Sequence, residues 1–376
     1  PSAISHPAAQ EGTAMRAAPD PKLVEHLEKK AAECYQNVLL PINARMLGPL
    51  PQPETVTSRP MVLLLGNHSS GKSTFVNHLL GTEVQKSGVA PTDDCFTLVT
   101  SGAKDSDQDG PSLIGDPDLG FAALRNFGNI LMSHVNLKVR SKVKINNVIV
   151  VDSPGMIDCP ATQTSASSST VTGQTLASVG QTYDRGYNFM AVTRWFATQS
   201  DLILLFFDPD KPGTTGETLE CLTSALQGMD HKVMIIFNKC DQFLKMHDFA
   251  RAYGSLCWNL SKVIPRKDLP PIFTMCTPVP GLRQGLGEES VRDLHNTREE
   301  VMEKVRNAME MRVDNMISKL DDSTRVLQMY AWVCTNVRNK VRDMWWSVHL
   351  SSAAVFAGAA GVSLALYLGK GEIVSR

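Results

Sequence analysis

The segment VLLLGNHSSGKSTFVNHLLG, residues 62–81, limits the fold of this chain more than any other segment. It joins a short apolar run, typical of a buried strand, to a glycine-containing loop and then to an apolar pattern of helical spacing. Gly66 and Gly71, followed by Lys72 and Ser73, have the spacing of a phosphate-binding loop. A turn with a chance Gly-Lys-Ser triplet is the alternative, and the order strand, loop, helix argues against it.

Such a loop turns backbone N–H groups inward, and the following helix adds its positive N-terminus, so that together they bind anions. We expect Lys72 to contact the β- and γ-phosphates and the Ser73 hydroxyl to ligate Mg²⁺. The helix is expected to end at Gly81. The predicted nucleotide-binding residues of the loop are Gly66, Ser69, Ser70, Gly71, Lys72, Ser73 and Thr74.

Two later apolar runs also end in residues that bind nucleotides. VVDSPG contains Asp152 and Gly155 in a DxxG arrangement, which is also common in surface turns. There the carboxylate would hold a Mg²⁺-bound water, and the glycine N–H would face the γ-phosphate. FNKCD contains Asn238, Lys239 and Asp241, where the aspartate can accept two guanine N–H groups and the lysine stem packs over the ring. Because nucleotides bind at the carboxyl ends of parallel strands, the three motifs together predict one nucleotide site.

Three further residues complete the predicted catalytic set. Thr92, in VAPTDDCF, is expected to close over Mg²⁺ when the γ-phosphate is present. His68 and Ser69 belong to the loop, where His68 either orders the attacking water or simply lines the loop. The predicted catalytic residues are Lys72, Thr92, Asp152, Gly155, Ser69 and His68. The predicted metal ligands are Ser73, Thr92 and, through a water, Asp152.

The wider pattern predicts an α/β P-loop fold with a doubly wound, mostly parallel sheet and a helical domain from flanking segments. The runs at 148–152, 202–208 and 233–239 are typical of buried strands. A helix is expected at 21–40, ending at Pro41, and the triplet DDS at 321–323 is expected to separate two later helices. The predicted parts are a linker or targeting remnant at 1–19, a helical segment at 20–56, a G domain at 57–285, a helical domain at 286–346 and a hydrophobic anchor at 347–376.

Composition excludes some classes of function. The 376 residues contain 37 Lys plus Arg and 38 Asp plus Glu, so that no net positive field favours nucleic acid, and no nucleic-acid partner is expected. The 8 cysteines are scattered without a CxxC or Cys/His cluster. They are interpreted as reduced, mostly buried thiols.

The quoted motifs, with APTDDCFTLV, RGYNFMAVTRWFATQSDLILLFFD and ARAYGSLCWNLSKVI, resemble the EH-domain-containing branch of the dynamin superfamily and its relative sarcalumenin. The likeness covers residues 20–346. It implies a dynamin-type G domain, a helical domain from both flanks, and nucleotide-dependent dimers or rings on membranes. It also implies slow, assembly-stimulated hydrolysis. No EH domain follows in this sequence, so peptide recognition through that module is not implied.

Several points stay open at this level. Asp241 favours GTP, whereas the resemblance favours ATP, because EH-domain-containing proteins use adenine nucleotides with the same motif. A Ser/Thr-rich insert at 159–182 lengthens the region after DxxG. Arg185 is either a charge that acts in the switch region or, as we expect, a solvated arginine. One alternative is a catalytically weak, nucleotide-bound scaffold in a membrane assembly. A small-molecule kinase is the other, but such enzymes lack paired DxxG and NKxD motifs.

The C-terminal segment is expected to bind a membrane. Residues 350–368 are nineteen residues without a charge, enough to cross a hydrocarbon core. Trp345 and Trp346 precede them, where an interfacial belt places aromatic residues, and Lys370 follows. A helix buried against protein is the alternative, because Ala, Gly and Ser dominate the segment. Membrane lipids and further copies of the chain are the predicted partners, on the cytosolic face of an endomembrane or on an organelle membrane.

Overall fold

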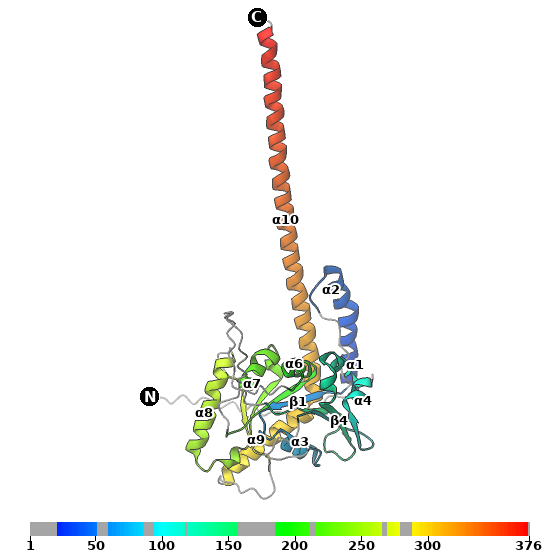
Figure 1. Ribbon diagram of the computed structural model, residues 1–376, viewed down its shortest axis with the longest axis vertical. Coiled ribbons are helices and arrows are strands. Elements are labelled where there is room, and N and C mark those ends of the chain that lie inside the picture. The colour runs from blue at the N-terminus through cyan, green and yellow to red at the C-terminus, as the bar shows by residue number, and fades with distance from the viewer. Residues whose placement is uncertain are drawn as a thin grey trace, which may run out of the picture. The chain divides into compact units, whose positions relative to one another are not determined.

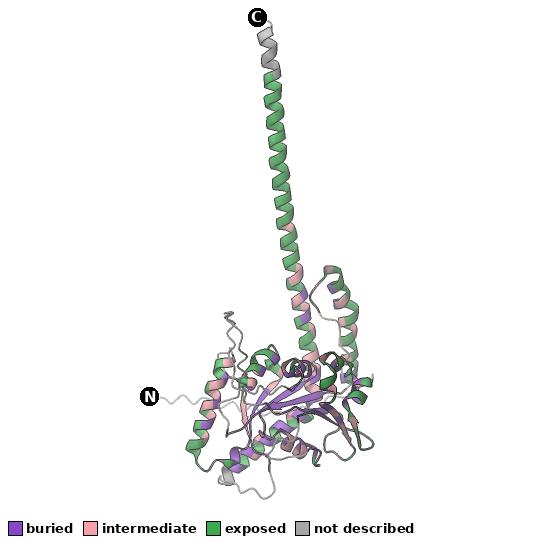
Figure 2. Cartoon of the chain, in the orientation of Figure 1, coloured by how far each residue is buried: buried purple, intermediate pink, exposed green. Residues whose placement is uncertain are grey.

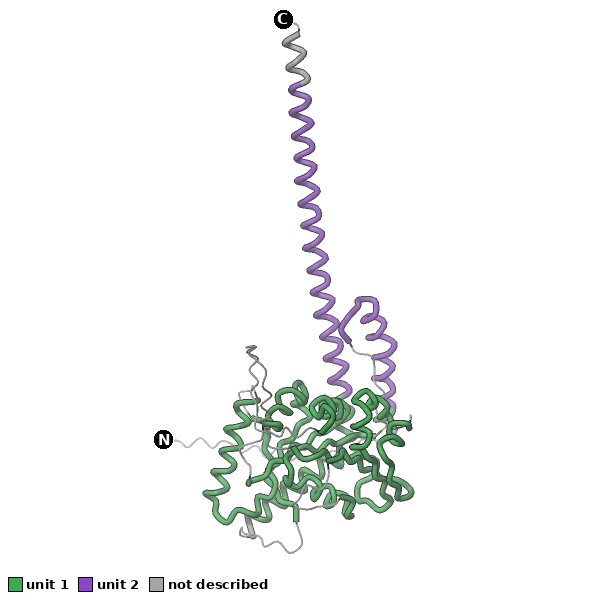
Figure 3. Tube along the Cα trace, viewed as in Figure 1, with its two compact units in different colours: residues 1–25, 54–315 green, residues 26–53, 316–376 purple. Residues whose placement is uncertain are grey.

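The computed structural model describes residues 21–50, 59–85, 94–116, 119–156, 185–210, 216–264, 269–278 and 288–374. The chain forms two compact units (Figure 3), one of residues 1–25 and 54–315, the other of residues 26–53 and 316–376. The predictions made for 1–19, for Thr92 and for the insert at 159–182 lie outside the described residues.

The first unit is built on one eight-stranded sheet (Figure 1). Its strands are β1 (Met61–Gly66), β2 (Phe96–Ser101), β3 (Ser106–Asp109), β4 (Val135–Arg140), β5 (Ile149–Asp152), β6 (Leu202–Phe207), β7 (Val233–Phe237) and β8 (Ile272–Thr274). Their order is β3-β4-β2-β5-β1-β6-β7-β8. Neighbours are parallel, except that β2 runs antiparallel to β5 and β3 to β4. This mostly parallel sheet confirms the predicted α/β class.

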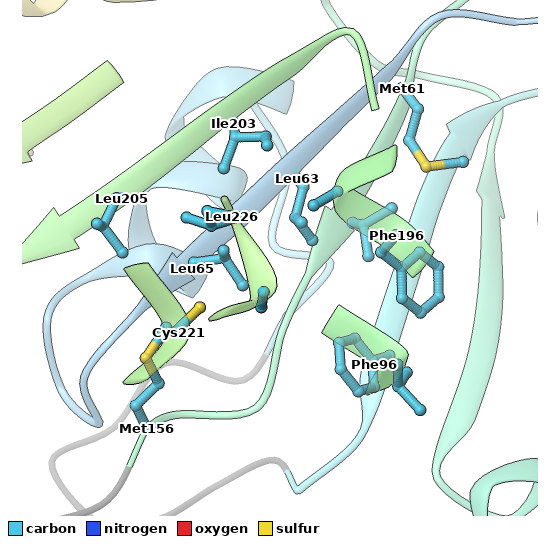
Figure 4. Close-up of a cluster of buried hydrophobic side chains, with 14 of the residues drawn as sticks. Met61, Leu63, Leu65, Phe96, Met156, Phe196, Ile203, Leu205, Cys221 and Leu226 are labelled. Atoms are coloured by element: carbon cyan, nitrogen blue, oxygen red, sulfur yellow. The ribbon is translucent and has the colours of Figure 1, made fainter. Parts of the chain in front are cut away.

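Strand β1 is continuously apolar because helices cover both faces of the sheet. Val62 and Leu64 belong to one buried cluster, and Met61, Leu63 and Leu65 to another. Part of the second cluster is drawn in Figure 4. A strand buried on both faces leaves no room for polar alternation, which is why the run in the sequence reads as uniformly hydrophobic.

Long helices form the two covering layers. The face that contains Val62 is covered by α3 (Lys72–Leu80), α9 (Glu288–Arg306) and the first turn of α10 (Ala308–Val374). The opposite face is covered by α6 (Phe189–Gln199) and α8 (Met246–Val263), and α3 and α6 lie on opposite sides of the sheet (Figure 1). The shorter helices of this unit are α4 (Gly110–Gly115), η3 (Ala122–Phe127), α5 (Asn129–Met132), α7 (Gly216–Glu220), η4 (Cys221–Ala225), η5 (Asp230–Lys232) and η6 (Cys240–Gln242).

The N-terminal helix begins at Pro21 as α1 (Pro21–Cys34), as predicted. The prediction that Pro41 ends this helix is wrong, since the chain continues through a π-helix, η1 (Tyr35–Leu39), into α2 (Leu40–Met46). Pro41 lies in the first turn of α2, where its missing N–H disturbs the helix least. The helix ends instead at Leu47, whose φ of 51° is left-handed.

The prediction that DDS separates two helices is also wrong. Helix α10 runs unbroken from Ala308 to Val374, and the break between α9 and α10 lies at Asn307, well before the triplet. Aspartate and serine reduce helix propensity by at most about 0.7 kcal/mol each, far less than proline. Within the triplet region, Arg325 Nε pairs with Asp321 Oδ2 one turn away at 2.9 Å. A polar triplet without Gly or Pro is therefore too weak to end a long helix.

In the second unit, the loop after α2 is held by side chains. Asn43 Nδ2 donates to the Leu50 carbonyl at 3.2 Å, and Leu50 N donates back to Asn43 Oδ1 at 3.0 Å. The hydroxyl of Tyr330, in α10, donates to the Leu47 carbonyl at 3.1 Å. These bonds satisfy backbone groups of the loop that follows α2, which have no partners in a helix or strand.

The C-terminal part of α10 is exposed (Figure 2). Among the described helices, α10 is one that length and composition allow to cross a membrane, with a mean hydropathy of 1.5 over its most apolar window and none of that window buried. Residues 350–366 are all exposed, so that no other part of this chain that the structure describes covers them.

The cysteines of the described residues all have free thiols, as predicted. The expectation that they are mostly buried is wrong. Cys221, Cys240 and Cys276 are buried, whereas Cys34 and Cys334 are exposed. The buried three belong to a core cluster of the sheet, and the other two described cysteines, Cys95 and Cys257, are half-buried.

Candidate nucleotide-binding site

The loop between β1 and α3 needs glycine at two positions. Gly66 and Gly71 have φ angles of 149° and 93°. A side chain on Gly66 would collide with the backbone oxygen of Phe206 in β6, and one on Gly71 would collide with the side-chain amide of Asn238. Two features therefore require glycine at both positions: other segments of the chain approach closely, and the backbone has a positive φ.

The ammonium group of Lys72 is buried within this loop. Its Nζ donates to the Gly66 carbonyl at 2.8 Å and to the Asn67 carbonyl at 3.0 Å. Burial lowers the pKa of Lys72 to about 8, while the Asp152 carboxylate raises it and the Arg185 guanidinium lowers it further. The Lys72 ammonium can exchange these neutral carbonyl contacts for phosphate oxygens. The negative charge of the phosphate would then compensate the positive charge of the lysine.

Asp152 and Ser73 lie side by side, although 79 residues separate them in the sequence. Ser73 Oγ donates to Asp152 Oδ2 at 2.7 Å, and Gln85 Nε2 donates to the same oxygen at 3.1 Å. Lys138 Nζ in turn donates to Gln85 Oε1 at 2.8 Å. A hydroxyl beside a carboxylate fits Mg²⁺, which takes one or two protein oxygens and completes its shell with phosphates and water.

The DxxG turn after β5 is packed against the phosphate loop. A Cβ added to Gly155 would lie 2.7 Å from the Cα of His68. The His68 N–H donates to the Met156 carbonyl at 3.1 Å, and the Met156 N–H donates to the Gly66 carbonyl at 3.1 Å. These two bonds fix the DxxG turn and the phosphate loop to each other.

The expectation that Arg185 is solvated is wrong. Its side chain is only 7% exposed, and Nη1 pairs with Glu217 Oε1 of α7 at 2.9 Å. Its second terminal nitrogen, Nη2, donates to the Gly155 carbonyl at 2.8 Å. The sequence showed an arginine after a polar insert, and nothing in that pattern indicated a buried partner.

The NKxD residues lie at the end of β7. Asn238 Nδ2 donates to the Ser70 carbonyl at 3.0 Å, so this amide holds the phosphate loop from the side. Lys239 has a left-handed φ of 57°, and its Nζ pairs with Asp208 Oδ2 at 2.7 Å. The Asp241 side chain is buried, and burial raises its pKa, while its own backbone N–H, His295 and Lys239 act in the opposite direction.

The predicted residues thus meet at the carboxyl ends of β1, β5 and β7, except Thr92, which is not described. Ser69 lies in the loop with a φ of 63°, and Thr74 lies in the first turn of α3. Within the described residues, Ser70 Oγ and Asn238 Oδ1 are buried without a hydrogen-bond partner. Polar atoms of this kind at the loop suit a polar ligand. Sequence reasoning missed the supporting residues Gln85, Lys138, Glu217 and Thr218.

The sheet order and the three motifs define a P-loop G domain. A family profile described as the dynamin family matches residues 62–240. EH domain-containing protein 2 of Homo sapiens is 31% identical over 260 residues, which cover 67% of this chain and 44% of that protein. EH domain-containing protein 1 of Bos taurus is 25% identical over 338 residues, which cover 87% of this chain and 58% of that protein.

By these matches the chain belongs to the dynamin superfamily, on the branch of the EH domain-containing proteins. The chain spans about half the length of the curated relatives it matches. Among solved structures, a chain of an oligomerised bacterial dynamin pair is similar with a TM-score of 0.41 at 13% identity, covering 88% of this chain and 52% of that chain. Era in complex with a nucleotide analogue and ribosomal RNA is similar with a TM-score of 0.35 at 15% identity, covering 67% of this chain and 57% of that chain.

Proposed function

We propose that this chain is a membrane-associated, dynamin-like nucleoside triphosphatase that binds GTP with Mg²⁺ and hydrolyses it slowly, coupled to dimerisation and higher assembly on membranes. The observation that carries this proposal is the bond from Ser73 to Asp152 at 2.7 Å beside the buried ammonium of Lys72. It places a hydroxyl, a carboxylate and a cation together at the end of β1, which is the set that a Mg²⁺-bound triphosphate requires.

Each residue has a proposed part in this reaction. Lys72 would hold the β- and γ-phosphates, and Ser73, Thr92 and a water on Asp152 would hold Mg²⁺, which neutralises phosphate charge when bound. The Gly155 N–H would contact the γ-phosphate, while His68 and Ser69 line the place from which water attacks. Catalysis of this kind depends on positioning and on charge neutralisation, so no strong base is needed.

We propose that Asp241 recognises the base of the nucleotide. Its buried carboxylate has the acceptor geometry for the two N–H groups on the edge of guanine, and adenine has no such pair. Lys239, whose amine pairs with Asp208 at 2.7 Å, would present its stem to the ring face. GTP is therefore the proposed substrate, with ATP as the alternative.

Membrane binding and assembly rest on other parts of the chain. The proposed anchor at 347–376, of which residues 350–366 are exposed and apolar in composition, would insert into the bilayer. We propose that two G domains meet across their bound nucleotides, with the flanking helical segments, 20–56 and 286–346, beside them. Sedimentation with a non-hydrolysable triphosphate and liposomes tests this part, and a strictly monomeric species would contradict it.

Steady-state phosphate release tests the enzymatic part. We expect slow release from GTP with Mg²⁺, faster release with liposomes, and loss of release on addition of EDTA. Fluorescent GTP and ATP analogues, titrated in parallel, identify the nucleotide. Tight binding without any release above background, with and without liposomes, would instead indicate a nucleotide-bound scaffold. Tight ATP binding without GTP binding would overturn the assignment of the base.

A further inference from the structure

Arg185 is a buried cation at the edge of the phosphate site. It precedes α6 by a short turn, and its Cζ lies 4.0 Å from the centroid of the Phe189 ring, near the start of that helix. A guanidinium stacked on an aromatic face with little exposure has lost most of its hydration, so it must be compensated by charged or polar partners.

Glu217 supplies the charged partner. Nη1 of Arg185 donates to Oε1 of Glu217 at 2.9 Å, and Nη2 donates to Oε2 at 3.3 Å. This is a two-point contact between planar groups, which fixes orientation as well as distance. The orientation leaves Nη2 directed at a third acceptor, the Gly155 carbonyl, at 2.8 Å.

That third acceptor belongs to the DxxG turn. Gly155 is wedged against His68 of the phosphate loop on one side, where even a Cβ would collide. Arg185 holds its carbonyl on another side. The turn therefore lies between the phosphate loop and a guanidinium whose own position is set by α7.

Helix α7 supports the phosphate loop as well. Thr218, the residue after Glu217, donates from Oγ1 to Asn67 Oδ1 at 2.6 Å, and both side chains are buried. Arg185 also lowers the pKa of Lys72, so the charge of its guanidinium is felt at the phosphate-binding ammonium. Consecutive residues of α7 thus fix the two segments that would surround a γ-phosphate.

We propose that Arg185, oriented by Glu217, is a positioning residue that holds the Gly155 turn in place and so sets the preference of the site for triphosphate over diphosphate. This inference rests on the proposed function, because it concerns the γ-phosphate side of the same site. An ion pair that only stabilises the fold is the competing explanation. That explanation predicts equal effects on both nucleotides.

The test measures the affinities of the full chain for GDP and for a non-hydrolysable GTP analogue, and for the adenine pair, with Mg²⁺. For Arg185→Ala we expect the triphosphate-over-diphosphate preference to fall about tenfold, the size of one lost charge-assisted bond, with diphosphate affinity nearly unchanged. Glu217→Gln keeps the size of the side chain and should lower the preference less. Arg194→Ala is the matched control, since Arg194 lies in α6, the helix that Arg185 precedes, and contacts the Ser224 carbonyl instead of the DxxG turn.

The two single variants and their double variant complete the design. If Arg185 and Glu217 act as a unit, the double variant should be no worse than Arg185→Ala alone. An unchanged preference in Arg185→Ala, or parallel losses for both nucleotides, overturns the inference while leaving the proposed function standing. If Arg185→Ala fails to fold, Glu217→Gln decides by the same criterion. A wild-type chain that binds neither nucleotide pair overturns the proposed function and this inference with it.

Discussion

Lys72 shows how a buried charge can be both a cost to the fold and a binding group. Its ammonium contacts two loop carbonyls at 2.8 and 3.0 Å, and burial lowers its pKa to about 8. Carbonyl dipoles compensate a full charge only in part. A bound polyphosphate would therefore be stabilised by a cation that the fold has already desolvated and oriented.

The first prediction follows from this arrangement. Lys72→Ala should weaken triphosphate binding on the order of 100-fold, because two charge-assisted contacts to phosphate oxygens are lost. Titration of a fluorescent triphosphate measures the change, and circular dichroism checks that the fold is retained. Lys104→Ala, which removes an exposed lysine of the same unit, should bind as the wild type does. Equal affinity in Lys72→Ala and the wild type would contradict the assignment.

Asp241 gives the second prediction, which concerns pH. Burial raises the pKa of this carboxyl above its usual 3.8. Since only the ionised form accepts both guanine N–H groups, guanine affinity should fall with decreasing pH earlier than for an ordinary aspartate. The sign for stability is opposite, because ionised Asp241 costs the free protein stability at neutral pH. That cost begins to shrink as the pH falls through the raised pKa and is gone below the usual 3.8.

A matched variant separates base recognition from phosphate binding. Asp241→Asn should reduce the ratio of GDP to ADP affinity about tenfold and abolish its pH dependence, because one acceptor becomes a donor. Competition titrations with both diphosphates, taken from neutral pH down towards the usual carboxyl pKa of 3.8, measure this ratio. If the variant keeps the wild-type ratio over that whole range, Asp241 does not recognise the base.

At this scale the sequence predicted residues but not their partners. Motif spacing identified Lys72 and Asp152, since both stand beside short, contiguous signals. Gln85 carried no such signal, because it meets Asp152 across 67 residues. Likewise Arg185 reaches Glu217 across 32 residues. Such pairs depend on how the strands are ordered in the sheet, and order is not written in local spacing.

Among the elements, the central strands and α3 were predictable and the outer ones were not. Buried strands such as β6 are uniformly apolar, which is a strong local signal. Strand β3, by contrast, is the polar run SDQD and is mostly exposed. It is a strand because it pairs with β4, so that no pattern in its own sequence predicts it.

In the helices, by contrast, residues that were expected to end a helix do not end it. Pro41 does not end the helix, because the π-helix η1 precedes it and Pro41 lies in the first turn of α2, where a missing N–H costs little. The DDS triplet does not end α10, because aspartate and serine lower helix propensity only weakly and do not break a helix as proline does. In both cases the neighbouring helical segments decide the outcome, and a single residue type does not.

The third prediction concerns how α2 ends. Asn43 is buried and makes both a donor and an acceptor bond with the backbone of Leu50. Asn43→Ala leaves two backbone groups without these partners, which should cost about 1–3 kcal/mol of local stability. Hydrogen exchange at the Leu50 amide measures this directly. Asn37→Ala, on the exposed side of η1, should leave the exchange rate unchanged, and equal protection in Asn43→Ala would contradict the role of this side chain.

On the scale of the whole molecule, α10 combines two different environments in one helix. Its first residue, Ala308, is buried in the core cluster of the first unit, and its C-terminal part contains the uncharged segment 350–368. A helix of 67 residues is about 100 Å long at 1.5 Å per residue. The uncharged part alone is about 28 Å, close to the thickness of a hydrocarbon core.

The fourth prediction is that this segment anchors the chain in a bilayer. Trp345 and Trp346 precede it, and exposed side chains such as Val355 and Phe356 would otherwise face water at a hydrophobic cost of about 2 kcal/mol each. After carbonate washing of membranes, we expect the full chain to stay in the pellet and a chain ending at Asp343 to be released.

A second variant keeps the length of the chain unchanged. Val355→Arg with Val362→Arg places two charges near the bilayer centre, which costs about 2.5–3.5 kcal/mol each on insertion scales. This double variant should be released like the truncated chain, whereas Lys370→Gln, outside the uncharged segment, should remain bound. Equal release of the full, truncated and double-arginine chains would show that the segment does not enter the membrane.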